Sequence, residues 1–365
     1  MKRSIPGLTK KGCKARQFIL KKILEEENLD SVFISDQKLV HYFTGFWGRN
    51  IFSPSFWMDV SGKSILSIPF DSEQEYFADE IIVYPSNRLG TLEDSQIQLS
   101  SSMILKNIKE KQKIGYYEII PGCYSSKYAW FDVSLKLLKM RRKKHEDEVK
   151  LLKFAIEACE EVYTHVPKLL KKGYDELELW SELHRVGANY IGETIGELGN
   201  DFQIGGLGSK PRPRKCLEGE VYILDLSLVV RGYVSDMCRS FLAAGKPNNL
   251  QIEAQEKIIE LLLDLEGKIK IGVSCHELHQ NAQDILHEWK DLKFTHHLGH
   301  GIGLSNHESP RINVEWDDCF VEGDVFTLEP GLYGDGLHAG LRIEEVYHLS
   351  NNNLLSLTNL PKESF

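Results

Sequence analysis

Apolar and polar positions follow two different patterns along the chain, and the pattern changes near residue 140. Before that point, short apolar runs such as "DSVFISD" (30–36), "ILSIPF" (65–70) and "EIIVYP" (80–85) lie between stretches with helical spacing. Buried strands that alternate with helices produce this pattern. The sequence therefore predicts an α/β domain over about residues 1–140 and a second domain over residues 141–365.

The second part of the chain begins with a long amphipathic helix. After the run "MRRKKHEDEV" (140–149), which changes from basic to acidic, apolar residues recur every three or four positions and form one continuous buried face. This face comprises Val149, Leu152, Ile156, Cys159, Tyr163 and Val166. Further helices are predicted over residues 174–191 and 249–269, and a fourth from residue 274, where Ser274 and Glu277 match a capping box.

The fourth helix contains the tetrapeptide "HELH" (276–279), which looks like a fragment of a zinc-protease motif. It lacks the HExxH spacing that would place two histidines on one helical face. Histidines near helix starts are commonly solvated, so we interpret His276 and His279 as part of a polar helix start.

The segment "VYILDLSLVVRGYVSDMCRSF" (221–241) is typical of a β-hairpin, with Gly232 able to supply a positive φ at the turn. If residues 229–232 form the loop, Asp225 lies directly opposite Asp236 on one face of the sheet. Like charges placed in this way destabilise a sheet, and a cation between them would remove the repulsion. Two exposed aspartates on a solvated face are the alternative, which the apolar neighbours disfavour.

Other acids and a histidine cluster lie in later segments. Two short strands, "DVFTLEPG" (324–331) and "GLRIEEVYHL" (340–349), carry Glu329, Glu344 and Glu345. The run "HHLGHGIGLSNHESP" (296–310) carries four histidines: His296, His297, His300 and His307. Two aspartates, two glutamates and His300 together form a ligand set that suits Mn, Fe, Co or Zn. A pair of ions that share carboxylates would use all four acids at once.

Composition excludes several other classes of protein. The chain has 365 residues, 42% hydrophobic residues and a formal net charge of −9, which disfavours a general nucleic-acid binder. The first twenty residues lack the apolar core of a secretory signal, and no stretch is long enough to span a membrane. The seven cysteines are scattered without CxxC spacing, which is typical of reduced thiols. We expect a cytoplasmic protein with no nucleic-acid or membrane partner.

The sequence resembles the pita-bread metallopeptidases (peptidase family M24), which include aminopeptidase P, prolidase and methionine aminopeptidase. The resemblance rests on "LDLSLVVRGYVSD", "GHGIGLSNHESP", "TLEPG" and "GLRIEE", which follow one another in the family's order. The segment "HYFTGF" (41–46) resembles the amino-terminal domain of the aminopeptidase P and prolidase branch. The resemblance implies an α/β (α+β) fold, in which a creatinase/prolidase-like domain precedes a pita-bread domain with a curved antiparallel sheet and outer helices.

The resemblance also implies roles for individual residues and a cofactor. The implied ligands of two divalent ions are Asp225, Asp236, His300, Glu329 and Glu344, with Asp236 and Glu344 as bridges. His296 and His307 would line the substrate site, Glu329 would also act as the base, and Arg342 would lie beside the last ligand. His297 has no assigned role and is expected to be structural. Manganese is the expected metal, with cobalt or zinc as alternatives, and a homodimer is the expected assembly.

The implied activity is hydrolysis of the peptide bond before proline by a dimetal-activated water, as an Xaa-Pro aminopeptidase or Xaa-Pro dipeptidase. A hydrolase or lyase that uses the same centre on a small non-peptide substrate is one alternative. A non-catalytic binding protein on this scaffold is another, although the complete ligand set argues against it.

One family feature is missing. Members of this branch carry a histidine about seventeen residues before the first metal aspartate, and that position is Gly208 here. The basic residues Lys210, Arg212 and Arg214 stand nearby, either in an exposed turn or as a wall that meets a substrate carboxylate. His338, just before Glu344, is a further candidate for contact with the substrate.

Overall fold

The computed structural model describes residues 4–48, 52–70, 75–84, 86, 95–196, 198–199, 201–287 and 289–363. The chain divides into two compact units. One unit comprises Gly7–Arg141, and the other comprises Met1–Pro6 together with Arg142–Phe365.

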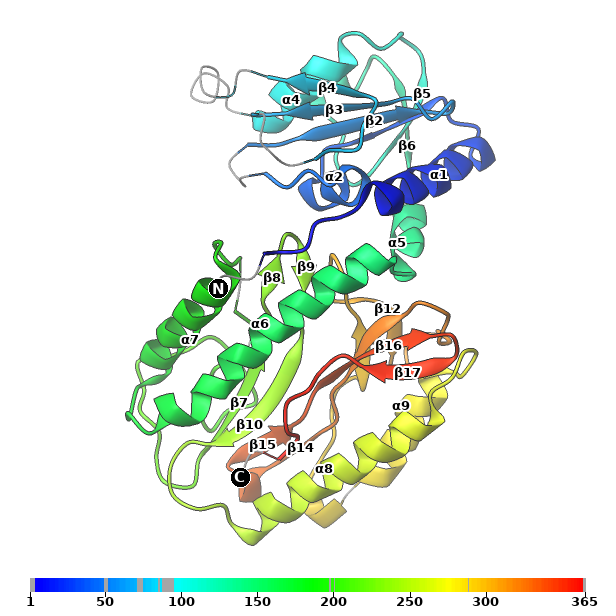
Figure 1. The fold of residues 1–365 in the computed structure, drawn as a ribbon. Helices are drawn as coiled ribbons and strands as arrows, with labels where there is room; N and C mark the ends of the chain where they lie inside the picture. Colours follow the sequence, from blue (N-terminus) through cyan, green and yellow to red (C-terminus); the bar gives the residue numbers. More distant parts are fainter. Residues whose placement is uncertain are drawn as a thin grey trace. The chain divides into compact units, whose positions relative to one another are not determined.

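The Gly7–Arg141 unit is built on a six-stranded mixed sheet with strand order β4-β3-β2-β1-β5-β6 (Figure 1). Strands β1, β2 and β3 pair antiparallel, whereas β4, β5 and β6 join as parallel strands. The predicted apolar runs form β1, β3 and β4; β1 and β3 are buried as predicted, whereas β4 is mostly exposed. The elements are α1 (Lys10–Glu26), β1 (Ser31–Ile34), α2 (Gln37–Thr44), β2 (Ser55–Asp59), β3 (Ser64–Ile68), β4 (Glu80–Val83), α4 (Gln96–Leu105), β5 (Lys113–Tyr116), η1 (Gly122–Tyr124), β6 (Ala129–Asp132) and α5 (Ser134–Arg142).

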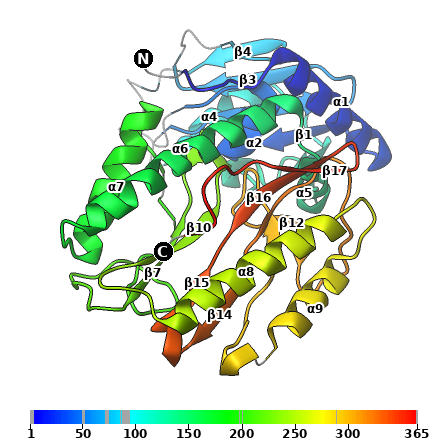
Figure 2. The ribbon, with the colours of Figure 1, turned by 60° about the horizontal axis from the view of Figure 1, so that its bottom comes forward.

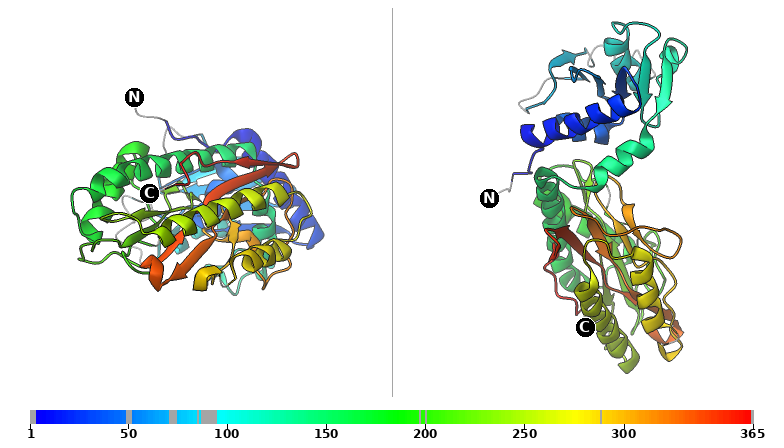
Figure 3. Two further views of the ribbon diagram at one scale, coloured as in Figure 1. Left: turned by 90° about the horizontal axis from the view of Figure 1, so that it is seen from below. Right: turned by 90° about the vertical axis from the view of Figure 1, so that its right-hand side faces the viewer.

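In the second unit, all strand pairs of the described part are antiparallel, and four long helices run along the strands (Figures 1 and 2). Figure 3 shows the same helices, in green and yellow, from two further sides. The helices are α6 (Glu146–Leu170), α7 (Glu176–Ile191), α8 (Asn249–Lys268) and α9 (Cys275–Leu286), with short turns η2 (Trp289–Asp291) and η3 (Asp335–Leu337). The strands are β7 (Val221–Leu226), β8 (Val229–Val230), β9 (Tyr233–Val234), β10 (Met237–Leu242), β11 (Gly299–Gly301), β12 (Glu308–Ile312), β13 (Val325–Leu328), β14 (Gly331–Gly334), β15 (Ala339–Arg342), β16 (Glu345–Ser350) and β17 (Asn353–Ser356).

Helix α6 holds the β7–β10 pair through the apolar face that the sequence predicts. All six residues of that face are buried. The Tyr163 hydroxyl donates hydrogen bonds to the carbonyl oxygens of Leu224, at 2.9 Å, and Met237. One side chain of α6 therefore ties both strands that carry the aspartates, since Leu224 precedes Asp225 and Met237 follows Asp236.

The hairpin register differs from the predicted one. Val230 pairs with Tyr233, so the turn contains only Arg231 and Gly232, with φ values of 48° and 86°. Two positive φ values are the signature of the two-residue turn that matches the twist of antiparallel strands. As a result Asp225 pairs with Cys238 and does not lie directly opposite Asp236. The shift is two positions, an even number, so both aspartates keep the same face of the sheet.

The segment 340–349 was predicted as one strand, and the structure divides it in two. Strand β15 ends at Arg342, and β16 begins at Glu345 in a different sheet. Glu344 therefore lies at the crossover between two sheets, where its amide donates a hydrogen bond to the Cys238 carbonyl at 3.0 Å.

The close approach of β11 to β13 yields a stability prediction. A Cβ atom at Gly299 would lie 2.0 Å from the Thr327 carbonyl oxygen, and backbone cannot move aside as a flexible side chain can. We expect Gly299→Ala to lower the free energy of unfolding by about 1–3 kcal/mol, as overpacking does elsewhere. Chemical denaturation would measure the change. Gly267→Ala is the control, because open space surrounds that helical position, and it should be neutral or slightly stabilising.

Candidate metal centre

Four carboxylates and one imidazole converge on one region of the second unit. Each lies at or beside the end of a strand: Asp225 in β7, Asp236 before β10, His300 in β11, Glu329 after β13 and Glu344 between β15 and β16. The His300 Nε2 atom lies 3.5 Å from Glu329 Oε1 and 3.7 Å from Asp236 Oδ2. Ligand atoms of Asp236, His300 and Glu344 all lie within 4.8 Å of one another. The structure thus brings together all five residues that the resemblance identifies as ligands.

Burial and mutual repulsion dominate the electrostatics of this region. Glu344 is only 1% exposed and Asp236 4% exposed. Burial raises the pKa of both carboxyls well above its ordinary value, and the neighbouring carboxylates raise it further. Burial also raises the pKa of Asp225 to about 6, against the opposing effect of Arg342. A cation placed among these carboxyl groups would stabilise their ionised forms, so the cluster favours cation binding.

The donor atoms fit divalent ions. Asp225 Oδ1 and Glu344 Oε2 are buried, and no described residue donates a hydrogen bond to either oxygen. The His300 Nδ1–H group donates to the Gly301 carbonyl at 3.1 Å, because a carbonyl can only accept. The lone pair of His300 Nε2 is therefore left facing the carboxylates, which is how a second hydrogen bond orients a metal-binding histidine. Oxygen donors with one or more imidazoles suit Mn, Fe, Co or Zn.

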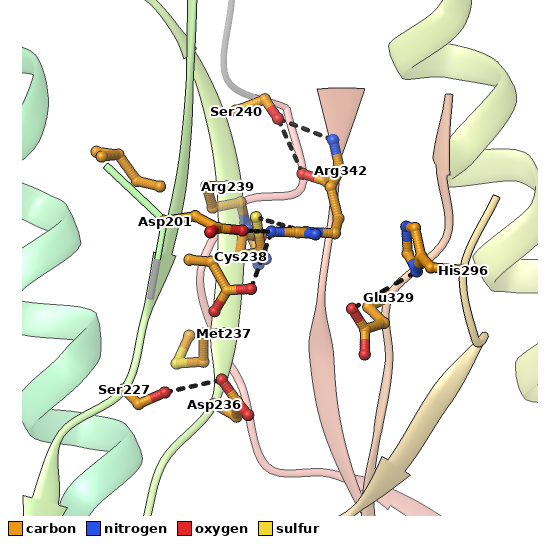
Figure 4. Close-up of polar contacts among 12 residues, drawn as sticks. Asp201, Ser227, Asp236, Met237, Cys238, Arg239, Ser240, His296, Glu329 and Arg342 are labelled. Carbon is orange, nitrogen blue, oxygen red and sulfur yellow. Dashed lines mark hydrogen bonds and ion pairs between the residues drawn. The ribbon is translucent and has the colours of Figure 1, made fainter. Parts of the chain in front are cut away.

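Arg342 contacts one of the five residues, Asp225. The Nη2 group of Arg342 donates to Asp225 Oδ2 at 3.0 Å, and the Nε group lies 3.4 Å from the Cys238 sulfur. The Arg342 backbone is fixed through Ser240, whose hydroxyl accepts from the Arg342 amide at 2.8 Å (Figure 4). The guanidinium neutralises one side of Asp225 and leaves its second oxygen for an ion.

Asp201 is a member of the site that sequence reasoning missed. Its Oδ2 atom accepts from Arg342 Nη2 at 2.5 Å, and Figure 4 shows Arg342 reaching it. Its backbone also forms an isolated bridge with Asp225, and Ile204 forms another with Tyr222, so both residues lie beside β7. A Cβ atom at Gly208 would lie 2.1 Å from Asp201 Cγ. The Asp201 carboxylate therefore takes the space into which a histidine at position 208 would project.

His296 is locked as a neutral imidazole. Its Nδ1–H donates to the His297 carbonyl at 2.8 Å, so Nε2 must accept, and it lies 2.6 Å from the Tyr333 hydroxyl. Burial lowers the pKa of His296 to about 4. Tyr333 is a second residue that sequence reasoning missed, because it lies 37 positions away and carries no motif.

His297 and His307 flank His300. The Nε2 atom of His297 lies 2.8 Å from Glu329 Oε1, so His297 contacts a residue of the centre directly. The ring of His307 lies 3.8 Å from that of His300, centroid to centroid, and His307 is exposed. Burial tends to raise the pKa of Glu329, but the imidazoles of His297 and His300 outweigh this effect and bring it to about 2.

The basic segment lies in ion pairs. Arg212 pairs with the buried Glu176 at 2.6 Å, and Arg214 pairs with Glu220 at 2.6 Å. Either arginine would have to leave its carboxylate to meet a substrate. Lys210 is exposed.

His338 and His279 lie outside the carboxylate cluster. His338 is exposed beside Gly219, at the tip of the β14–β15 hairpin, whose other end carries Arg342. His279 is buried, which corrects the solvated helix start that we predicted. Its Nε2 atom lies 3.3 Å from the His296 carbonyl, so it packs behind the histidine run.

The fold and the site together define a metal-dependent hydrolase, and comparison with known proteins agrees. Residues 150–351, more than half of the chain, match the model of metallopeptidase family M24. The chain belongs to this family, and its enzyme class is metallopeptidase.

Relatives with similar sequences extend over nearly the whole chain. A Staphylococcus aureus protein described as an uncharacterized peptidase is 28% identical over 365 residues, which cover 94% of this chain and 99% of the relative. A Staphylococcus epidermidis protein with the same description is also 28% identical, over 94% of this chain and 98% of its own.

Solved structures show the same pita-bread fold. An Xaa-Pro dipeptidase from Bacillus anthracis superposes with a TM-score of 0.78 at 21% identity, over 96% of this chain and 99% of its own. A prolidase from Pyrococcus furiosus gives 0.75 at 22% identity, over 93% and 99% of the two chains. An X-Pro aminopeptidase from Thermotoga maritima gives 0.73 at 24% identity, over 96% and 99%. Separately, no helix among the described residues has the length and apolarity needed to cross a membrane.

The raised pKa of Glu344 yields a prediction for protein whose divalent ions have been chelated. Between the ordinary value of 4.5 and the higher folded value, the folded chain binds a proton that the unfolded chain has released. Stability must therefore fall as pH rises above about 4.5, by about 1.4 kcal/mol for each unit of the shift. We expect Glu344→Gln to flatten this fall in urea titrations from pH 4.5 to 8. The exposed Glu256→Gln should reproduce the wild-type slope, and an unchanged slope in Glu344→Gln would contradict the assignment.

Proposed function

We propose that this chain hydrolyses the peptide bond before proline, as an Xaa-Pro aminopeptidase or Xaa-Pro dipeptidase. The observation that carries the proposal is the convergence of Asp225, Asp236, His300, Glu329 and Glu344, in a fold shared with Xaa-Pro peptidases. In this proposal the five residues hold two divalent ions. Such ions polarise a scissile carbonyl and supply a nucleophile at neutral pH.

The chain's own residues would handle protons and orientation. Glu329 is a buried base whose pKa lies below its ordinary range, so it is ionised and can take up a proton from the attacking nucleophile. It would then pass that proton to the leaving nitrogen. His307 is exposed beside His300 and can stabilise charge on the substrate, while Arg342 keeps Asp225 in place.

Proline explains why such an enzyme needs a dedicated site. A bond before proline is a tertiary amide, and the ring fixes φ and removes the N–H group. Manganese is the expected metal, with cobalt or zinc as alternatives. The Gly7–Arg141 unit would be the creatinase/prolidase-type domain of this branch. The homodimer and the cytoplasmic location remain predictions, of which light scattering tests the first.

A hydrolase or lyase on a small non-peptide substrate is the second candidate. The position of Asp201 favours it, because its carboxylate takes the space of the family histidine and adds a negative charge beside Arg342. A substrate that does not need that histidine would be compatible with this arrangement.

Metal content gives the first test. After loading with Mn²⁺ and removal of free ions, elemental analysis should find two ions per chain. Asp236→Asn should hold fewer, because it removes a ligand that both positions would share. Each ion bound at a concentration near 100 times its Kd should stabilise the wild type by about 2.7 kcal/mol. No more than trace metal in the wild type would contradict the dinuclear centre.

Activity gives the second test. A panel of Xaa-Pro, Xaa-Pro-Yaa and longer peptides, assayed after restoring Mn, Co or Zn, should show slow but measurable cleavage. His307→Ala should keep two ions and lose activity by about 10²–10⁴-fold, as expected for loss of one charge-stabilising group. The exposed His287→Ala is the control. Two bound ions without cleavage of any member of the panel would favour the non-peptide substrate.

A further inference from the structure

His297 is the histidine of the run 296–310 for which neither its motif nor the proposed function supplies a role. It is half-buried, and ligand atoms of His297, His300 and His307 lie within 4.8 Å of one another. Three imidazoles at this separation are a second group of potential metal ligands, and it shares His300 with the group that contains Asp236 and Glu344.

Distances to Glu329 distinguish His297 from His307. Glu329 Oε1 lies 2.8 Å from His297 Nε2 and 3.5 Å from His300 Nε2, so two ring nitrogens approach the same carboxylate oxygen. Among the ion pairs of the described residues, His307 makes none with Glu329. The Nε2 atoms of His297 and His300 therefore both lie close to Glu329 Oε1.

We propose that His297 is a nitrogen ligand of the ion that His300 and Glu329 bind, and that this position selects a borderline ion such as Zn²⁺ or Co²⁺ over Mn²⁺. The inference rests on the dinuclear centre proposed above. Imidazole favours Zn and Co, and ordinary affinities rise from Mn²⁺ to Co²⁺, with Zn²⁺ also above Mn²⁺. The other position, supplied by Asp225, Asp236 and Glu344, is rich in oxygen and suits a harder ion. The two positions would then differ in the metal that they prefer.

The alternative role for His297 is to hold Glu329 in place without binding an ion, and a pair of variants separates the two roles. His297→Gln keeps an N–H group that can donate to Glu329 Oε1 but removes the imidazole nitrogen. His297→Ala removes both. His276→Gln is the matched control, because His276 is exposed on α9 and makes no contact with the centre among the described residues.

The experiment is equilibrium dialysis of the metal-free full chain against equimolar Mn²⁺ and Zn²⁺, followed by elemental analysis. Visible absorption during Co²⁺ titration reports the ligands directly. In the wild type we expect one position to take Zn²⁺ in preference to Mn²⁺. Both His297 variants should lose affinity for Zn²⁺ at that position by about tenfold or more, since even outer contacts of a ligand are worth 10–100-fold. Their Co²⁺ absorption bands should shift, whereas those of His276→Gln should not.

Three results would overturn the inference. Zn²⁺ affinity and Co²⁺ bands that match the wild type in both His297 variants would show that the residue is not a ligand. Loss in His297→Ala with full retention in His297→Gln would assign it a positioning role through Glu329. A wild type that binds no more than trace metal would overturn the dinuclear centre itself, a failure that is distinct from the first two. Circular dichroism would confirm that the variants are folded, as expected for a half-buried position.

Discussion

Repulsion among buried carboxylates is the constraint on which the second unit depends. Asp236 and Glu344 are nearly inaccessible to water, and burial raises the pKa of each well above its usual range. A sheet does not gain stability from such a cluster, because like charges without water repel strongly. Arg342 compensates for one carboxylate, but it contacts Asp225 from the outer side. Bound cations would compensate for the charge of the other carboxylates, and the free energy of cation binding would then contribute to folding.

The fold brings most of the proposed ligands together where the strands are irregular. Asp236 lies before β10, Glu329 follows β13, and Glu344 lies where the chain leaves one sheet for another. The register between β11 and β12 shifts after His300. Regular strands direct side chains alternately to two faces, whereas ends and bulges can direct them to one point. Buried contacts hold these strands in position, such as the hydrogen bonds from the Tyr163 hydroxyl to the backbone of β7 and β10.

The main helices could be predicted from the sequence because they depend on local periodicity, and the buried face of α6 follows helical spacing. The five proposed ligands could be singled out because they occur within recognisable motifs, and the structure brings their side chains together. The hairpin register could not be derived in the same way, since Arg231 adopts a positive φ that is uncommon for a residue other than glycine. Tyr333 and Asp201 were missed because their roles exist only through contacts with residues 37 and 141 positions away. No role was predicted for His297, because the family motif assigns roles to the neighbouring histidines but not to this position.

The missing histidine and Asp201 are linked through Gly208. That glycine has a φ of 134°, which side chains rarely adopt, and a Cβ atom there would overlap the Asp201 carboxyl group. Gly208→His alone would therefore meet both backbone strain and a steric clash, so the position cannot regain its histidine without movement of Asp201. Asp201 is in turn held by Arg342, which also holds Asp225. The loop at Gly208 is thus connected through Asp201 and Arg342 to Asp225, the first of the proposed ligands.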